Sequence, residues 1–141
     1  MSAQPKIKKG TFQHIESELY AYHETRKEIV RLKNDILYAS HPVDSNGGGR
    51  SNLPGDPTAR TATLLTTHRE LESLERIVGA IDSVYESLPD EKRRLIQLKY
   101  WSKPQTRTWD GIALEMSTHR VTLIRWRNDI VRSIAAKLGW R

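Results

Sequence analysis

The sequence of 141 residues contains no cysteine. A disulfide framework, a thiolate zinc site and a cysteine nucleophile are therefore excluded. Apolar residues make up 37% of the chain and phenylalanine occurs once, below the roughly 45–50% apolar content usual for globular domains. No run approaches the roughly 18 apolar residues of a membrane span, and the lysine-bearing start lacks the pattern of a secretory signal. We therefore expect a soluble cytoplasmic protein that has no membrane partner.

Motifs that carry enzyme chemistry are also missing. Gly47–Gly49 are followed by Arg50 and Ser51, whereas a phosphate-binding loop continues with Lys and then Ser or Thr. The five histidines lack a metal-ligand spacing such as His-Glu-x-x-His. We expect no catalytic residues, no metal, no other cofactor and no enzymatic activity.

Charge is plentiful, and it is distributed unevenly along the chain. Residues 1–88 hold 11 Lys and Arg against 12 Asp and Glu, a net charge of −1. Residues 89–141 hold 12 against 5, a net charge of +7. A strongly basic module attached to a near-neutral one indicates a polyanionic partner, either nucleic acid or an anionic surface. A soluble domain with a basic tail is the alternative interpretation of the charge alone.

Helical periodicity predicts two long helices in the near-neutral part. Residues 11–40 place apolar side chains at helical spacing, with Thr11 as the expected N-cap. Residues 58–88 carry a heptad pattern, whose two repeating positions are Leu64, Leu71, Val78 and Tyr85, and Thr67, Leu74, Ile81 and Leu88. Such a pattern indicates a coiled-coil-like seam. Because a hairpin of two helices has little core of its own, we expect its apolar stripe to pack either against a further segment of the chain or against a second copy. We favour self-association into a homodimer or a higher homo-oligomer.

The most informative segment, residues 109–128, reads WDGIALEMSTHRVTLIRWRN. Its spacing is typical of a helix-turn-helix, in which a small residue (Ala113) lets the second helix cross the first closely. Ser117–Thr118 form the expected turn, and Leu123 and Trp126 are expected to pack the second helix on the first. The segment therefore predicts DNA binding, with two ordinary packed helices as the alternative.

Two polar residues define the ends of the first helix of this segment. Thr108 is the expected N-cap. Ser117 stands where turns of this kind favour glycine, and a left-handed backbone would strain a serine there by about 1 kcal/mol. We discount that strain, because asymmetric turns often avoid the left-handed conformation.

The side chains left outward on the second helix are the candidate DNA-binding residues. The first choice for base contacts is Arg120, Val121, Ile124 and Arg125, because arginine matches the guanine O6/N7 edge and valine can contact a thymine methyl. The second choice, for phosphates or base edges, is His119, Thr122, Arg127 and Asn128. Lys103 and Arg107, in the loop before the helix pair, are expected to hold the DNA backbone.

Proline and glycine gather in residues 41–57, which contain three of the six prolines and four of the eight glycines. This composition predicts a flexible connector, with Arg50 as a less favoured candidate for a phosphate contact. The expected fold is therefore all-α and has two domains. Residues 1–88 form a helical oligomerisation hairpin with a flexible loop at 41–57, and residues 89–141 form a basic helix-turn-helix domain.

The C-terminal part resembles region four of sigma factors, through LPDEKRRLIQLKYW followed by TWDGIALEMSTHRVTLIRWRNDIV. The whole chain resembles the RinA family of phage late-gene transcriptional activators. The residues that carry this resemblance are KGTF (9–12), GGGRSN (47–52), GDPT (55–58) and STHRVTLIRWRNDIV (117–131). Thr118, His119 and Arg120 stand where that family usually carries Ser-Arg-Ser/Thr, so the resemblance assigns no base preference.

The resemblance implies an activator of phage morphogenesis, packaging and lysis genes. Such a protein binds DNA upstream of a late promoter, acts with the host RNA polymerase and resides in the host bacterial cytoplasm. An alternative is a DNA-packaging protein similar to a terminase small subunit, which also joins a helix-turn-helix to helical oligomerisation segments. A third possibility is a protein that binds polymerase without touching DNA, although the outward Arg120 and Arg125 argue against it.

Overall fold

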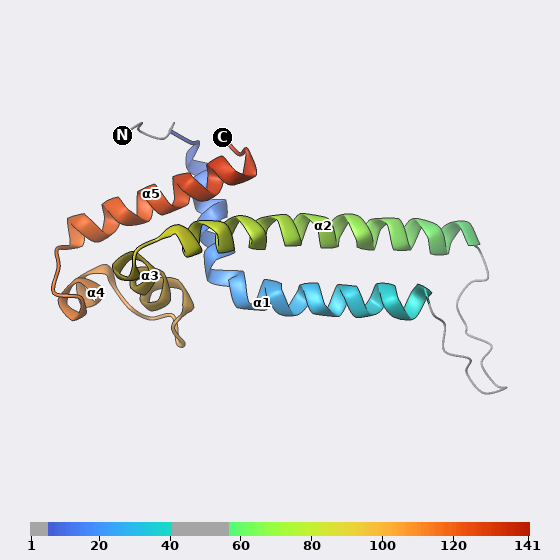
Figure 1. The fold of residues 1–141 in the computed structure, drawn as a ribbon, viewed down its shortest axis with the longest axis horizontal. Coiled ribbons are helices and arrows are strands. Elements are labelled where there is room, and N and C mark those ends of the chain that lie inside the picture. Colours follow the sequence, from blue (N-terminus) through green and yellow to red (C-terminus); the bar gives the residue numbers. More distant parts are fainter. Residues whose placement is uncertain (1–5, 41–56) are drawn as a thin grey trace. The chain divides into compact units, whose positions relative to one another are not determined.

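The computed structural model describes residues 6–40 and 57–141, and these residues form helices and connections without any strand (Figure 1). The elements are α1 (Lys9–Ser40), α2 (Pro57–Ser87), α3 (Asp90–Ile96), the π-helical turn η1 (Gln97–Trp101), α4 (Trp109–Glu115) and α5 (Arg120–Leu138). The predicted all-α fold is confirmed. The predicted connector and Arg50 lie outside the described residues, apart from Pro57, which begins α2.

The chain divides into two compact units, and the two long helices contribute to both. The main unit comprises Met1–His23 and Ile77–Arg141, and the smaller unit comprises Glu24–Arg76. This division differs from the expected boundary after residue 88. The reason is that the first half of α1 and the last turns of α2 share a hydrophobic core with the C-terminal helices.

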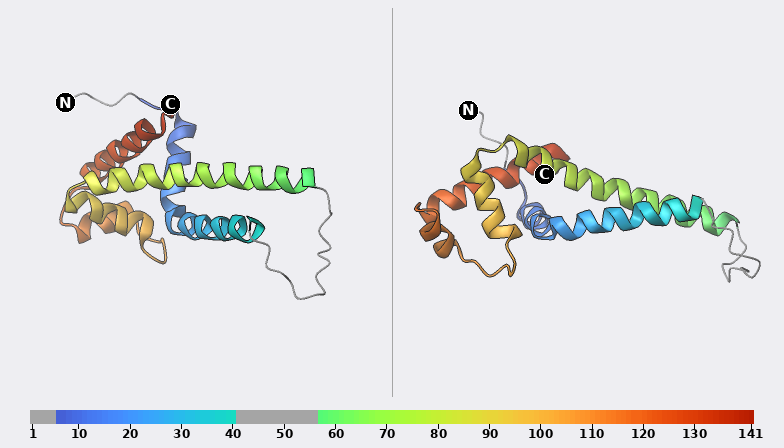
Figure 2. Two further views of the ribbon diagram at one scale, coloured as in Figure 1. Left: turned by 45° about the vertical axis from the view of Figure 1, so that its right-hand side comes forward. Right: turned by 60° about the horizontal axis from the view of Figure 1, so that its bottom comes forward.

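The smaller unit is a hairpin of two antiparallel helix segments, which lie side by side in Figures 1 and 2. Ile29 and Leu32 of α1 are buried, as is Leu71 from the predicted heptad of α2. Nζ of Lys33 lies 3.6 Å from Oε2 of Glu75 and links the two helices at the surface. Leu71 is the buried heptad residue of this unit, and Leu64, Thr67 and Leu74 are half-buried. The predicted self-association of this helix stays a prediction.

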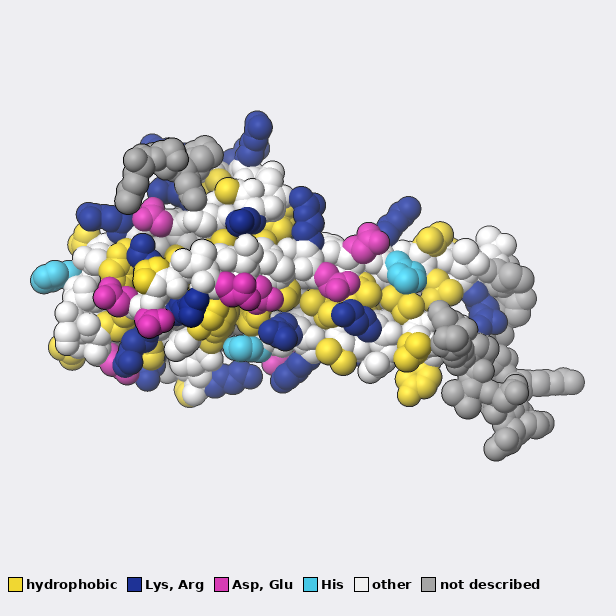
Figure 3. All heavy atoms as spheres, in the orientation of Figure 1, with side chains coloured by type: hydrophobic (Ala, Val, Ile, Leu, Met, Phe, Trp, Pro, Cys, Tyr) yellow, Lys and Arg dark blue, Asp and Glu magenta, His cyan; other side chains and the backbone are white. Residues whose placement is uncertain are grey.

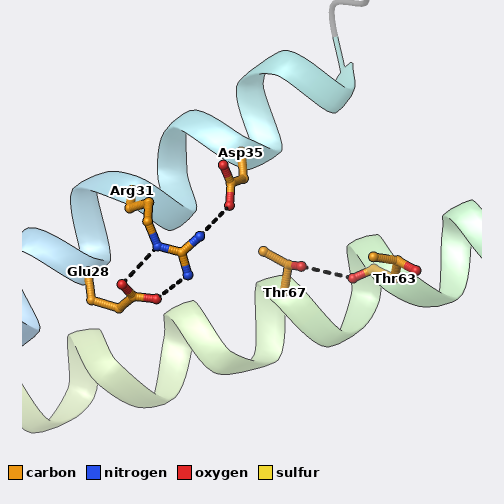
Figure 4. A network of polar contacts seen from close by, with 5 residues as sticks. All are labelled: Glu28, Arg31, Asp35, Thr63 and Thr67. Carbon is orange, nitrogen blue, oxygen red and sulfur yellow. Dashed lines mark hydrogen bonds and ion pairs between the residues drawn. The ribbon is translucent and has the colours of Figure 1, made fainter. Parts of the chain in front are cut away.

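The surface of the hairpin carries local polar contacts (Figure 4). Arg31 donates from Nε to Oε2 of Glu28 at 2.9 Å and from Nη1 to Oδ2 of Asp35 at 3.1 Å. The hydrogen bond between Arg31 and Glu28 raises the pKa of the arginine and lowers that of the carboxyl. On the neighbouring helix, Oγ1 of Thr67 donates to the carbonyl of Thr63 at 2.9 Å. Water screens the interactions between these surface groups, so the contacts add little to the free energy of unfolding.

The core of the main unit takes apolar side chains from every element. Its buried members are Ile15, Leu19, Tyr22, Ile77, Val78, Ala80, Ile81, Val84, Leu95, Ile96, Tyr100, Ile112, Ala113, Leu123, Ile130, Val131, Ile134, Ala135 and Leu138. Several α2 residues outside the heptad are therefore buried here, because helices pack on more than one side of α2. Arg93 also binds the end of α2, donating to the carbonyls of Tyr85 at 3.0 Å and Glu86 at 2.6 Å.

One predicted helix end is wrong and another is confirmed. α1 begins at Lys9, and the backbone N–H of Phe12 already donates to the carbonyl of Lys8, so Thr11 is not the N-cap. Oγ1 of Thr11 instead donates to the carbonyl of Arg141 at 2.5 Å. Thr108 does cap α4, since its Oγ1 accepts a hydrogen bond from the backbone N–H of Gly111 at 3.0 Å.

No helix in the described ranges combines the length and the hydropathy needed to cross a membrane. The long helices carry charged residues on their outer faces, as the ion pairs of Arg31 and Lys33 illustrate. Their apolar stripes face other helices, which is the pattern of amphipathic packing.

The core makes a direct prediction for stability. Leu19 is fully buried in the main unit, whereas Leu37 on the same helix is 56% exposed. Leu19→Ala should lower the free energy of unfolding by about 2–5 kcal/mol, because it leaves a cavity, and Leu37→Ala should change it by less than about 0.5 kcal/mol. Urea unfolding followed by helical circular dichroism measures both. Equal losses would contradict the burial described for these two side chains.

Candidate nucleic-acid interface

Helices α4 and α5 form a helix-turn-helix. The backbone N–H of Met116 closes α4 with a 2.8 Å hydrogen bond to the carbonyl of Ile112, and that of Thr118 donates to the carbonyl of Ala113 at 3.0 Å. His119 has an extended backbone and immediately precedes α5. The predicted turn and the two predicted helices are therefore present, with α5 starting at Arg120.

The turn contains a left-handed residue at the predicted position. Ser117 has a φ of 53° and is the one non-glycine residue of the described chain with a positive φ. The expectation that an asymmetric turn avoids this conformation is wrong. A serine in this conformation is strained by about 1–2 kcal/mol, because its Cβ approaches the backbone. The tight reversal between α4 and α5 thus imposes a strain that glycine would not feel.

The two helices approach closely because small and apolar side chains meet between them. Ala113 of α4 is 7% exposed and Leu123 of α5 is fully buried, as predicted. Ile130 and Ile134 continue the buried face of α5. Trp126 is only half-buried, and Nζ of Lys92 from α3 lies 5.9 Å from the centre of its ring. This packing fixes which side of α5 faces solvent.

Most of the first-choice residues are exposed at the start of α5. Val121 is 66% exposed, and Arg120 and Arg125 are also exposed, whereas Ile124 is half-buried. The side chain of Arg120 is 56% exposed, and its Nε lies 3.9 Å from Oδ1 of Asp110. A surface pair this long and exposed holds the arginine weakly, so Arg120 can turn toward another acceptor.

The second-choice residues and the loop residues are placed differently. His119 is exposed, and Thr122 and Asn128 are half-buried on α5. Arg107 forms an ion pair with Glu115, so this guanidinium already has a carboxylate partner. Lys103 is exposed in the loop before α4. Figure 3 shows Lys and Arg side chains over α5, on the left of the view, with acidic side chains among them.

Arg127 does not share this outward surface. Its side chain is 18% exposed, and Nη1 donates to Oε2 of Glu16 at 3.0 Å. The guanidinium carbon lies 5.0 Å from the ring centre of Phe12 and 5.2 Å from that of Trp109. The arginine thus binds α1 and α4 to α5 through an ion pair and two cation–π contacts. It supports α5 from behind, and the structure does not group it with the exposed candidate residues.

The carboxylate at the centre of this contact was not predictable from the sequence pattern. Glu16 lies 111 residues from Arg127 in the chain, and its Oε2 also accepts a hydrogen bond from the hydroxyl of Tyr100 at 2.7 Å. Burial, followed by the charge of Glu16, raises the pKa of the Tyr100 phenol. The phenol therefore remains a hydrogen-bond donor to Glu16 across the whole neutral range.

Within the described residues no cluster of three or more His, Asp or Glu side chains could hold a metal ion. The arrangement is instead one of exposed cations and small apolar groups on a helix that is supported from behind. These side chains can donate hydrogen bonds and attract an anion.

Comparison with known proteins places the chain in one family. The family model described as "Protein of unknown function (DUF722)" matches residues 14–136, so the chain belongs to that family. The matched range runs from the first half of α1 almost to the end of α5 and includes the helix-turn-helix. No curated protein and no solved structure matches the chain in the other two comparisons.

The strained turn yields a prediction. Ser117→Gly should raise the free energy of unfolding by about 0.5–1 kcal/mol, because glycine removes the left-handed strain but loses more backbone entropy on folding. Ala136→Gly is the matched control: it introduces glycine at an exposed right-handed position of α5 and should lower stability by about 1 kcal/mol. Urea denaturation compares the two. A destabilising Ser117→Gly would show that the turn is not strained.

Proposed function

We propose that this protein is a sequence-specific double-stranded DNA-binding protein that activates phage late-gene transcription. The observation that carries the DNA-binding part is the exposed set of Arg120, Val121 and Arg125 at the start of α5. The helix that presents them is fixed by the buried contacts of Ala113 and Leu123. A second helix held rigidly across a first, with outward cations in its first turns, is the arrangement that reads the major groove.

The side chains at this surface support readout of bases as well as attraction to phosphates. An arginine can donate two hydrogen bonds to O6 and N7 of one guanine, and an exposed valine can contact a thymine methyl. Arg125 has no ion-pair partner among the described residues, so its guanidinium is available for such a contact. His119 and Arg120 lie at the positive end of the α5 dipole, where phosphate oxygens are attracted.

The transcriptional part of the proposal rests on resemblance. The C-terminal helices resemble sigma region four, and the chain as a whole resembles the RinA family of late activators. We propose the host RNA polymerase as the protein partner and the host bacterial cytoplasm as the location. The morphogenesis, packaging and lysis genes of the phage are the proposed targets.

We further propose that the protein acts as a homodimer or a higher homo-oligomer. In the smaller unit Val30, Leu37, Tyr38 and Leu65 expose more than half of their surfaces, and an apolar helix face of this kind supports association with a second copy. Two recognition helices would then read half-sites separated by about 34–36 Å, one turn of DNA, or by a multiple of it.

Arg125→Ala tests the DNA-binding part. The full-length protein is first used to select bound sequences from a random duplex pool. The variant should then lose about 1–3 kcal/mol of binding free energy on the selected site, relax one base position and lose less on a scrambled duplex. Fluorescence anisotropy at a fixed salt concentration measures both affinities.

Arg69→Ala is the matched control, because Arg69 is an exposed arginine of the smaller unit. It should leave both affinities within about twofold of wild type, since it removes the same charge away from the helix-turn-helix. An equal loss on selected and scrambled DNA for Arg125→Ala would show that Arg125 only binds phosphate.

The activator role has a separate test in a lysogen during prophage induction. The tagged protein should give one chromatin peak just upstream of a late promoter, and late transcripts should fall in the Arg125→Ala strain but not in the Arg69→Ala strain. A peak inside the packaging genes with unchanged transcripts would contradict activation and favour a role similar to that of a terminase small subunit.

A further inference from the structure

The side chain of Asn128 is oriented by its neighbour in the chain. Nε of Arg127 donates a hydrogen bond to Oδ1 of Asn128 at 2.8 Å. Since a guanidinium N–H can only donate, the oxygen of the amide faces Arg127 and its NH2 group faces away. No hydrogen bond within the described ranges uses that NH2 group. The amide therefore presents its donors away from Arg127, and Arg127 engages one of the two lone pairs of the amide oxygen.

The orientation of Asn128 is fixed because Arg127 itself is fixed. The guanidinium is paired with Glu16, which also accepts the hydroxyl of Tyr100. It also lies near the rings of Phe12 and Trp109. Turning Arg127 would break the ion pair and leave a carboxylate that is only 22% exposed without its cation, which is costly. The donor group of Asn128 is thus preorganised before any partner binds.

Asn128 also lies on the face of α5 that carries the exposed candidate residues. It is three residues beyond Arg125 and seven beyond Val121, and residues at these spacings share one side of a helix. Its side chain is half-buried, and no side-chain nitrogen or oxygen that is fully buried in the described chain lacks a hydrogen bond. The unused NH2 group therefore reaches solvent beside the outward arginine.

We propose that Asn128 is a fixed hydrogen-bond donor in the DNA interface and that Arg127 is the residue that positions it. This inference rests on the proposed DNA-binding function. The partner of the Asn128 amide is a hydrogen-bond acceptor, either N7 of a guanine or a phosphate oxygen. Bidentate recognition of adenine is disfavoured, because the asparagine oxygen, already bonded to Arg127, would also have to accept from adenine N6 while the nitrogen donates to N7.

Asn128→Asp and Asn128→Ala test the donor role in the full-length protein. Asn128→Asp keeps an oxygen for Arg127 but places a negative charge against the acceptor on DNA. It should raise the Kd for the selected site by at least about 10-fold, because a carboxylate has no donor and its negative charge is repelled by a phosphate or by the lone pairs of a guanine edge. Asn128→Ala removes only the donor and should raise the Kd by about 3- to 10-fold.

Asn34→Asp is the matched control, since it adds the same charge at an exposed position of the smaller unit. It should change the Kd by less than about twofold. Thermal unfolding of each variant confirms that it folds. An Asn128→Asp protein that binds like the Asn34→Asp protein would overturn the proposal.

Two modified duplexes distinguish the sources of the acceptor. If the acceptor is a guanine, 7-deazaguanine at one position should weaken the wild-type protein and leave the Asn128→Ala protein unaffected. If it is a phosphate, one methylphosphonate should have this selective effect instead. An adenine preference that disappears in Asn128→Ala would contradict the proposal, because it would show that the amide oxygen reads the base.

The positioning role of Arg127 is tested by a double-mutant cycle. Arg127→Met keeps apolar bulk near Phe12 and Trp109 but releases the Asn128 amide. In that background Asn128→Ala should cost less than about twofold in Kd, whereas it costs about 3- to 10-fold alone. Additive effects would show that Arg127 contributes only to folding. If the wild-type protein selects no duplex, the proposed function fails. If it selects a duplex and the Asn128 variants bind that duplex as tightly as the wild-type protein does, only this inference fails.

Discussion

The carboxylate of Glu16 joins α5 to α1 and η1, which lie behind it. It accepts the phenol of Tyr100 from η1 and pairs with Arg127 from α5. A partly buried carboxylate without partners would be costly, and a partly buried guanidinium equally so. Each compensates the other, and the phenol supplies a further donor. The position of α5 relative to α1 and η1 is therefore specified by polar geometry, and apolar packing alone would specify it less sharply.

The exposed face of α5 depends on what its other face contacts. Leu123, Ile130 and Ile134 are buried, and Arg127 occupies the same side one helical turn after Leu123. A side chain with a charged head can fill a core-facing position only where a partner meets it. Because that side of the helix is occupied, Val121 and Arg125 are left on the opposite side and stand in solvent. The exposed face of α5 is thus a consequence of the buried contacts that its other face makes.

Local patterns in the sequence predicted the local structure well. The heptad of α2, the cap at Thr108 and the small residue Ala113 depend on neighbours a few positions away, so periodicity and spacing identify them. The left-handed Ser117 was recognised as a position of strain, but its conformation is decided by the approach of two packed helices. The helical periodicity of the sequence does not show how closely those two helices cross.

Contacts distant in sequence were not predictable from pattern. Arg127 was a candidate DNA contact because it belongs to a basic segment, and only the fold shows that Glu16 and Phe12 lie beside it. Thr11 was expected to cap a helix, yet it donates to the carbonyl of Arg141 at the other end of the chain. Neither residue type nor spacing carries such information, because the partners are brought together by the shared core.

The net charge of the C-terminal part overstates what is available to a polyanion. Arg127 is neutralised by Glu16, and Arg107 by Glu115. Arg93 is occupied by carbonyl groups at the end of α2. An arginine with a structural partner can contact phosphate only by giving that partner up, so it releases fewer counterions from DNA than a free one. In the proposed complex the attraction would therefore come from a small number of cations around α5, among which Arg125 stands on the same face as the oriented amide of Asn128. Under the proposed function, that concentration favours recognition of a defined site over uniform adhesion to the DNA backbone.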